Sequence, residues 1–210
     1  MLWVRSDLGI TLAGSKVSAW ADQSGSGNDV AQAVDANRPL YVAGAIPTVD
    51  FDETHPDFLG IASPLRATTA YTMAAVTSAA ATNAYETVCQ DYNDGAGIVP
   101  RGPTPGTWAQ HHRNLGDFYT TEAVAAGRHS VLISHAGGAS TVARVVVDGT
   151  AYTGVLAANP APSTGFTIGA REDGSNPGTL SLAELIVLNR QLSVAEEAAW
   201  NAYALGRYGV

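Results

Sequence analysis

Glycine and proline divide this chain into short apolar runs, and that division limits the folds it can form. The 210 residues include 22 glycines and 10 prolines, and 46% of them are hydrophobic. Apolar and polar residues alternate within the runs, as in TVDFD at 48–52, and the longer runs SVLISH and VARVVV begin at 130 and 142. A period of two between turn residues is typical of half-buried strands. The sequence therefore predicts a folded, turn-rich all-β protein.

The length and charge limit the domain count and the kind of partner. A chain of 210 residues suits one domain, 1–210, because all-β sandwiches commonly reach this size with a single core. The single cysteine, Cys89, cannot form an internal disulfide, and we expect it to be a buried small apolar residue. The net charge of −8 argues against nucleic acid, whose binding depends on Lys and Arg displacing counterions. No apolar run approaches the length of a bilayer span, so we expect no membrane insertion.

One turn, SAWADQSGSGND at 18–29, joins an aromatic core candidate to a polar corner. Asp22, Ser24 and Asn28 have short side chains that hydrogen-bond nearby backbone amides, and the glycines between them accept positive φ. The same oxygens at alternate positions loosely resemble a calcium loop, which needs six to eight hard ligands. The sequence leaves both readings open, with these three residues as weak calcium candidates and no other cofactor expected.

Two local patterns predict a hairpin and a helix. Asp148-Gly149 between valine and threonine favours a two-residue type I′ turn, which requires positive φ twice. Ser193 followed by Glu196 fits a capping box at the start of a C-terminal helix. We expect the helix to close one edge or end of the sandwich through a buried stripe that includes Trp200 and Tyr203.

About ten short strands and one terminal helix make a two-sheet antiparallel sandwich the predicted architecture. The alternation also predicts which side chains face the core. These are Trp20, Phe51, Phe58, Val131, Ile133, Val145, Phe166, Ile168, Leu185 and Val187.

Between 91 and 116 the composition shifts to glycine and proline, and this segment is the hardest to assign. Loops on a rigid scaffold often carry recognition, so Trp108, His112 and Arg113 are the candidate ligand-binding residues. The alternative is that Trp108 packs on an inner sheet face. His111 and His112 are adjacent, and neighbours on a strand point to opposite faces, which disfavours a shared zinc ion.

Four segments together resemble the laminin-G-like, concanavalin-A-like jelly-roll domains of bacterial and phage surface proteins. They are VSAWADQSGSGNDVAQ at 17–32, RP at 38–39 with VDFDETHPDFL at 49–59, VDGT at 147–150 with FTIGAREDG at 166–174, and the C-terminal AELIVLNRQLSVAEEAAWNAYALGRYG at 183–209. The resemblance implies a jelly-roll sandwich with one C-terminal helix. Such folds include glycan-binding lectins, adhesion modules and retaining β-glucanases.

The glucanases place closely spaced carboxylates on one strand. Here the comparable strand, SLAELIVLNR, carries Glu184 alone, and a structural carboxylate that bonds to loop amides is the favoured interpretation. Glu86 and Asp91 are further ionisable residues without an assigned role. We therefore expect no enzymatic activity, with a glycosidase or lyase acting on surface glycan as the alternative.

The context predicts a structural and binding module on the exterior of a phage or phage-like particle, as a head decoration, fibre or tail protein. Relatives of such domains usually sit in long exported proteins, whereas this sequence shows no signal peptide. The expected partners are other virion proteins, surface glycan and further copies in a symmetric homo-oligomer. A carbohydrate-binding domain excised from a larger bacterial surface protein would look identical.

Overall fold

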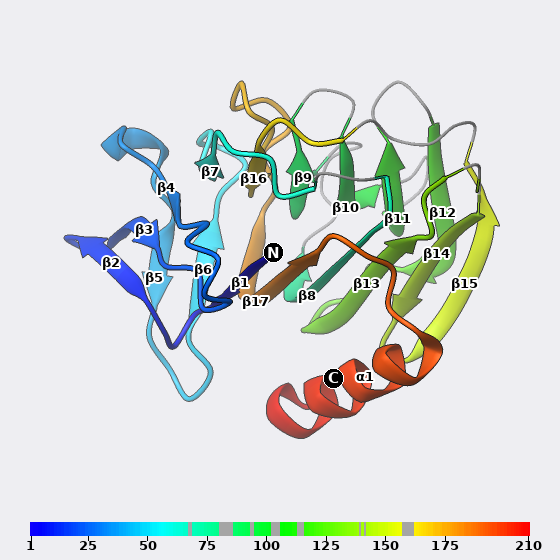
Figure 1. Ribbon diagram of the computed structural model, residues 1–210. Coiled ribbons are helices and arrows are strands. Elements are labelled where there is room, and N and C mark those ends of the chain that lie inside the picture. Colours follow the sequence, from blue (N-terminus) through cyan, green and yellow to red (C-terminus); the bar gives the residue numbers. More distant parts are fainter. Residues whose placement is uncertain are drawn as a thin grey trace.

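The protein is a two-layer β-sandwich with one long helix on its outer surface (Figure 1). The computed structural model describes all residues except 67–68, 80–85, 93–94, 102–105, 113–115, 139, 141 and 157–161, and the side chain at 101. Every strand pairing in the described residues is antiparallel. The predicted all-β sandwich with one C-terminal helix is therefore confirmed.

The first sheet is built around two long neighbouring strands, β17 and β8. On one side, β8 pairs with β13, which continues through β14 to β15, while the far side of β17 pairs with β1 and β6. From β6 the sheet extends through β5 and β3 to β2. The strands are β1 (Leu2–Arg5), β2 (Ile10–Ala13), β3 (Lys16–Trp20), β5 (Leu40–Val42), β6 (Thr48–Phe51), β8 (Tyr71–Ala79), β13 (His129–His135), β14 (Val142–Val147), β15 (Thr150–Val155) and β17 (Leu180–Leu188).

The second sheet has shorter strands and lies behind the first. Its order is β4, β7, β16, β9, β10, β11 and β12. The bounds are β4 (Val30–Ala31), β7 (Leu59–Ile61), β9 (Cys89–Asp91), β10 (Ala96–Arg101), β11 (Thr107–His112), β12 (Gly116–Ala123) and β16 (Phe166–Ile168), and a short 3₁₀ helix, η1, spans Asp35–Asn37. Strand β3 pairs with both β4 and β5, so the two sheets are continuous at that edge.

The main core fills the space between the sheets, as period-two alternation requires. Nine of the ten predicted core residues are buried, and Phe58 is the exception because it is only half-buried. Strand β7 begins one residue later, and Leu59 is the side chain that points inward. Cys89 is buried as expected, and burial raises the pKa of its thiol to about 12.

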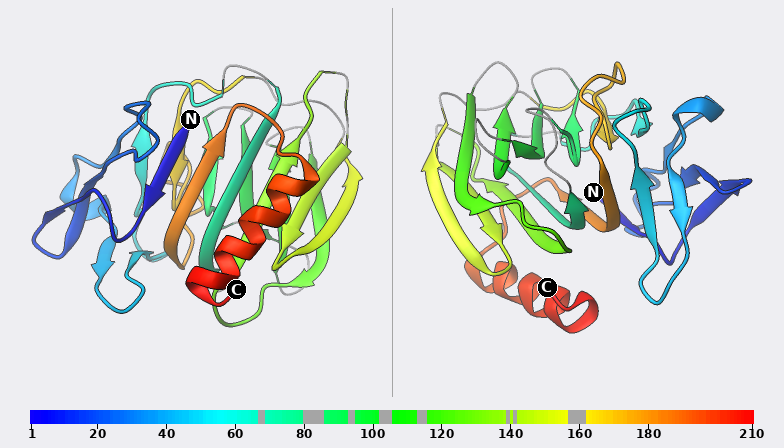
Figure 2. Two further views of the ribbon diagram at one scale, coloured as in Figure 1. Left: turned by 60° about the horizontal axis from the view of Figure 1, so that its bottom comes forward. Right: turned by 180° about the vertical axis from the view of Figure 1, so that it is seen from behind.

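The C-terminal helix α1 (Val194–Tyr208) begins and ends as the sequence predicts. The Ser193 hydroxyl accepts from the Glu196 amide, the Glu196 carboxylate accepts from the Ser193 amide, and Gly209 ends the helix at φ 79°. The expected position was wrong, however. The helix crosses the outer face of the first sheet and does not close an edge or an end (Figure 2).

A second apolar cluster joins the helix to that face. Trp200, Ala204 and Tyr208 pack on small and branched side chains of the central strands. The stripe therefore recurs at 200, 204 and 208, and Tyr203 lies beside it with 37% of its surface exposed. The prediction that Tyr203 shares the buried stripe was wrong, because its ring sits at the margin of the helix–sheet contact.

The hairpin at Asp148-Gly149 follows from the sequence, whereas the strands of the segment 91–116 do not. Asp148 and Gly149 have φ of 47° and 82°, so the type I′ hairpin between β14 and β15 is confirmed. The segment 91–116, which the composition left unassigned, contains β10 and β11, which form a hairpin paired along its length. No helix in the described residues is long and apolar enough to cross a membrane.

Candidate functional site

The candidate acid Glu184 lies beneath the helix. It is buried on the outer face of β17, where a register shift between Leu182 and Glu184 interrupts the alternation. Its carboxylate accepts from the Trp3 indole at 2.7 Å, the Tyr203 hydroxyl at 2.7 Å and the Tyr208 hydroxyl at 2.6 Å. Burial raises the pKa of Tyr208, and the bond to Glu184 adds to the shift. Glu184 is therefore structural, with aromatic donors as partners in place of the loop amides we expected.

The polar corner holds itself together through Asp22. Its Oδ1 accepts from the backbone amides of Trp3 and Ser24, and its Oδ2 accepts from the Ser24 hydroxyl and the Asn28 amide. The Asn28 side chain donates to the Met1 carbonyl at 2.6 Å. These bonds fully account for Asp22, Ser24 and Asn28 as turn residues, and calcium binding by them stays a prediction.

The structure buries two of the three candidate ligand-binding residues, Trp108 and His112. Trp108 is 0% exposed and lies in the core between the sheets, against the edge of His129. A ring in this position has no face for a ligand to stack on. His112 follows the same alternation and also points inward, where the Tyr71 hydroxyl lies 2.6 Å from its Nε2. Arg113 lies outside the described residues.

His112 belongs to a buried polar group between the sheets. Tyr71 bonds with His112 and accepts from Gln110, and the ring of His135 stacks on Tyr71 at 5.9 Å. Nearby, Arg66 donates to Asp91 at 2.6 Å, and both side chains are fully buried. Burial raises the pKa of Asp91 to about 6. Since these side chains have no exposed surface, the group acts as a polar part of the core.

The neighbouring His111 points to the opposite, outer face of the second sheet. Its Nδ1 contacts Asp117 on β12, and the Tyr119 hydroxyl donates to the same carboxylate at 2.7 Å. The adjoining cleft, lined in part by Glu86 and Gln90, has a volume of about 10 Å³. That is room for about one water molecule, so the cleft does not hold a ligand the size of a sugar.

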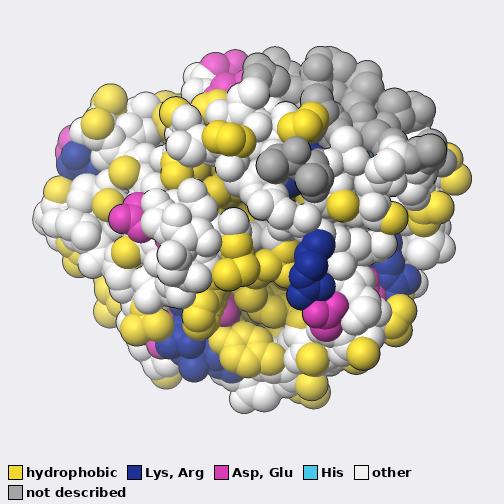
Figure 3. All heavy atoms as spheres, viewed as in Figure 1, with side chains coloured by type: hydrophobic (Ala, Val, Ile, Leu, Met, Phe, Trp, Pro, Cys, Tyr) yellow, Lys and Arg dark blue, Asp and Glu magenta, His cyan; other side chains and the backbone are white. Residues whose placement is uncertain are grey.

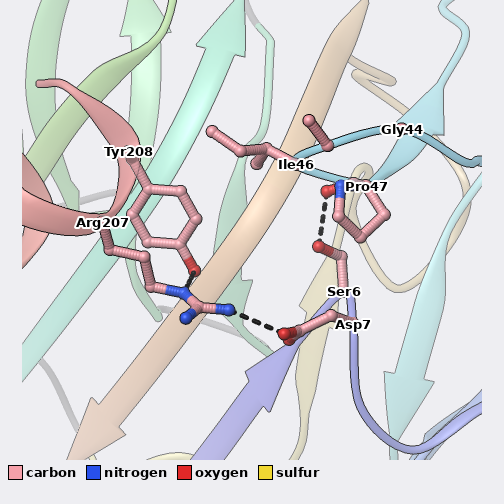
Figure 4. A pocket seen from close by; sticks show the side chains of 8 residues that line it. Ser6, Asp7, Gly44, Ile46, Pro47, Arg207 and Tyr208 are labelled. Atoms are coloured by element: carbon pink, nitrogen blue, oxygen red, sulfur yellow. Dashed lines mark hydrogen bonds and ion pairs between the residues drawn. The ribbon is translucent and has the colours of Figure 1, made fainter.

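Two hollows beside α1 have the volume for a ligand but the wrong lining. One of about 310 Å³ lies between the helix end and the β5–β6 turn (Figure 4), and its charged groups pair internally, with Arg207 donating to Asp7 at 2.6 Å. The other, of about 290 Å³, belongs to the hydrophobic surface beside the helix (Figure 3). Its lining is almost entirely apolar and includes Trp3, Ile186 and Trp200. The second hollow lacks the convergent polar groups of a typical ligand site, and the polar side chains of the first, such as Ser6 and Tyr208, already bond within the protein.

A third hollow is larger than these two, and several charged side chains are among the residues that line it. It measures about 500 Å³ and lies over β3, β5 and β6, with Asp50, Asp52, His55 and Asp57 among its lining residues and Phe51 among the apolar ones. A fourth hollow, of about 330 Å³, lies over β17 and β8 and shares Asp50, Phe51 and Thr179 with the third. We call the third and fourth hollows together the polar groove. Its size falls in the range of small-ligand sites.

Two carboxyl groups that line the polar groove have displaced pKa values. Asp57 is buried and accepts from the Asp52 amide, and desolvation raises the pKa of its side chain. Asp52 is exposed, and hydrogen bonds from the Thr54 amide and hydroxyl lower the pKa of its carboxyl. Two acids in one groove thus have pKa values displaced in opposite directions, the arrangement that separates a proton donor from a base.

The cations that line the polar groove are already engaged. Lys16 donates to the Asp35 carbonyl at 2.8 Å, and Arg38 donates to the Asp35 carboxylate at 3.1 Å. Arg38 also donates to the carbonyls of Gln32 and Ala33, both at 2.8 Å. These side chains hold the η1 segment in place, and because three carboxylates and two cations line the groove, its charge is negative.

No family model matches the chain, and no curated protein matches its sequence. Solved structures do share the fold. Domain 4 of the GH43 extracellular arabinanase AbnA from Geobacillus stearothermophilus, in complex with arabinotriose, aligns with a TM-score of 0.61 at 13% identity over 78% of this chain and 81% of that chain. A GH54 α-L-arabinofuranosidase aligns at 0.69 and 14% over 91% of this chain. Trypanosoma rangeli sialidase in complex with sialic acid aligns at 0.59 and 14% over 97%.

The likeness establishes a β-sandwich fold shared with glycoside hydrolases and with a domain solved together with a sugar. The chain spans 51% of the arabinofuranosidase and 33% of the sialidase. The expectation that the chain is not an enzyme was wrong, because chains with this fold include an arabinofuranosidase and a sialidase. A fold can host either binding or hydrolysis, so function has to be argued from the site.

Sequence reasoning missed the polar groove although part of its signal was visible. The alternation in TVDFD places Asp50 on the face opposite Val49 and Phe51. That pattern predicts an outward-facing carboxylate, but it does not predict a groove around it. Side chains two or four residues apart on a strand lie on the same face, so a Trp108 side chain in the core implies that His112 on β11 also faces the core.

Proposed function

We propose that the protein is a glycan-binding β-sandwich module whose ligand lies in the polar groove. The single observation that carries the proposal is the groove itself, whose larger hollow measures about 500 Å³ and is lined by carboxylates, a hydroxyl and the exposed side chain of Leu40. Carboxylates and hydroxyls accept and donate to sugar hydroxyls, while apolar side chains pack on sugar C–H groups. The fold shared with the arabinotriose-bound domain supports the same ligand class.

A direct binding assay tests the proposal. Binding of neutral oligosaccharides, arabinotriose included, is measured by glycan array and calorimetry for the wild type and for Asp50→Ala. We expect the substitution to weaken binding about tenfold, because a carboxylate that accepts from sugar hydroxyls is worth roughly 1.5–3 kcal/mol. Glu122→Ala, on the exposed face of β12, is the matched control and leaves binding unchanged. Equal affinity of wild type and Asp50→Ala for every glycan bound would place the site elsewhere.

The displaced pKa values of Asp57 and Asp52 favour glycoside hydrolysis as a second candidate function. Asp57, with its raised pKa, would protonate the leaving oxygen, and Asp52 would act as base or nucleophile. Release of reducing sugar from the glycan bound is the assay. The hydrolase proposal expects Asp57→Asn to abolish release while binding persists, and a wild type that binds but releases no sugar would leave binding as the function.

For the setting of this activity, we propose the exterior of a phage or phage-like particle, within the laminin-G-like, concanavalin-A-like group of domains. The acidic charge supports this, because it repels nucleic acid packaged inside a capsid. Copies on a particle, together in a symmetric assembly with other virion proteins, would raise weak glycan contacts to useful avidity. Mass spectrometry of purified particles tests the setting: the protein should occur there in fixed stoichiometry, and its absence would refute this part.

A further inference from the structure

The floor of the polar groove includes a row of residues drawn from five adjacent strands. The register pairs Lys16 on β3 with Leu40 on β5, Leu40 with Asp50 on β6, Asp50 with Ser181 on β17, and Ser181 with Ser78 on β8. Directly opposed residues in antiparallel strands point to the same face. Their sequence neighbours Val17, Val49 and Leu182 are buried in the core, so the row faces outward. All five line the groove.

The geometry of the row fits a linear polymer that crosses the strands. Neighbouring strands lie about 4.8 Å apart, so five strands place side chains along roughly 19 Å at regular intervals. That interval is close to the rise of one monosaccharide in an extended glycan chain. The two hollows share Asp50, Phe51 and Thr179 among their lining residues, so the row lies along one continuous trough over β3, β5, β6, β17 and β8.

The chemistry of the row suits hydroxyl groups. Within the described residues, the side-chain hydroxyls of Ser78 and Ser181 make no hydrogen bond, so both can donate to and accept from a ligand. Asp50 accepts from the Thr48 hydroxyl through Oδ1 at 2.6 Å and keeps Oδ2 for a further donor. Leu40 is 46% exposed and offers an apolar surface to the C–H side of a sugar ring.

The charge of the groove disfavours acidic sugars. Asp50, Asp52 and Asp57 line it, and the two cations, Lys16 and Arg38, already bind Asp35 and nearby carbonyls. A carboxylate on the ligand would meet like charges at close range in a partly desolvated site, which is unfavourable. A neutral chain carries no such penalty.

We propose that the polar groove binds an internal stretch of a linear, uncharged polysaccharide, with successive sugar units over β3, β5, β6, β17 and β8. The inference rests on the proposed function and names the ligand class of that same site. Two consequences follow and are measured separately: the affinity depends on the length of the glycan chain, and acidic sugars are excluded.

The experiment is calorimetric titration of the full chain with linear neutral oligosaccharides of increasing length, arabino-oligosaccharides among them, and with sialylated and uronate-bearing oligosaccharides of matched length. We expect affinity to rise with length until the row is filled, and the acidic probes to bind at least about tenfold more weakly. Ser181→Phe, in the trough between Asp50 and Ser78, should weaken the long neutral probes by about tenfold or more and remove the dependence on length. Thr153→Phe, on the exposed strand β15, is the control and changes neither.

The results distinguish a failure of the proposed glycan-binding function from a failure of the proposed ligand class. Absence of binding to every glycan overturns both the proposed function and this inference. Binding that does not depend on length, that persists in Ser181→Phe, or that prefers acidic probes overturns the inference alone. If Ser181→Phe lowers the melting temperature, Ser181→Asn, which keeps a polar side chain, replaces it, and a length dependence like that of the wild type is then expected.

Discussion

The carboxylate of Glu184 gives the sharpest stability prediction, because it ties β17 to β1 and to α1. Replacing it with alanine leaves the Trp3 indole and the Tyr208 hydroxyl without an acceptor in a region where water enters poorly. Tyr208 is only 7% exposed, so its hydroxyl loses the full hydrogen bond, whereas Tyr203, at 37% exposed, can bond to water. A buried donor without a partner costs about 1–3 kcal/mol.

We therefore expect Glu184→Ala to lower the free energy of unfolding by about 2–4 kcal/mol, counting Tyr208 in full and the half-buried Trp3 in part. In a domain of this size that loss lowers the melting temperature by roughly 4–16 °C. Glu184→Gln keeps an acceptor of the same shape and should lose less. Urea denaturation followed by tryptophan fluorescence measures both.

A matched control uses the same type of bond at an exposed site. The Tyr152 hydroxyl donates to Glu122 at 2.8 Å on the surface, and Glu122→Ala should change stability by no more than about 0.5 kcal/mol. If Glu184→Ala lowers the free energy of unfolding no more than Glu122→Ala does, burial does not strengthen the hydrogen bonds of Glu184. Our account of the contact between the helix and the sheet would then be refuted.

Three further outcomes are expected. Trp200→Ala should cost about 3–5 kcal/mol, since the ring is buried and its indole donates to Ser130, and an unchanged melting temperature would show that the helix is peripheral. Cys89, with its raised pKa, should not react with a thiol reagent in the native state and should react on unfolding; rapid labelling without denaturant would contradict its burial. Burial raises the pKa of Asp91 from 3.8 to about 6, so the folded state binds the proton more tightly; this contribution to stability is complete below about pH 4 and is lost as the pH rises through 6. The stability of Asp91→Asn relative to wild type should vary across that interval, and a constant difference would show that Asp91 keeps its ordinary pKa.

The sequence by itself determined the features that depend on neighbours along the chain. Asp148-Gly149 specifies a type I′ turn because few residue pairs accept positive φ twice, and Ser193 with Glu196 specifies the helix start because each satisfies the other's backbone amide. Alternation likewise identified most of the core, because side chains on a strand change sides at every residue. Phe58 escaped this rule where the strand begins one residue later than the pattern indicates.

Only the tertiary structure decided where those elements meet. The row in the polar groove comes from β3, β5, β6, β8 and β17, and β3 and β17 lie near opposite ends of the sequence. The register that aligns Asp50 with Ser181 exists only once the sheet forms. The Glu184 carboxylate accepts hydrogen bonds from Trp3, near one terminus, and from Tyr208, near the other. No local pattern encodes these contacts, because hydrogen bonds and packing between distant segments depend on the whole sheet being assembled.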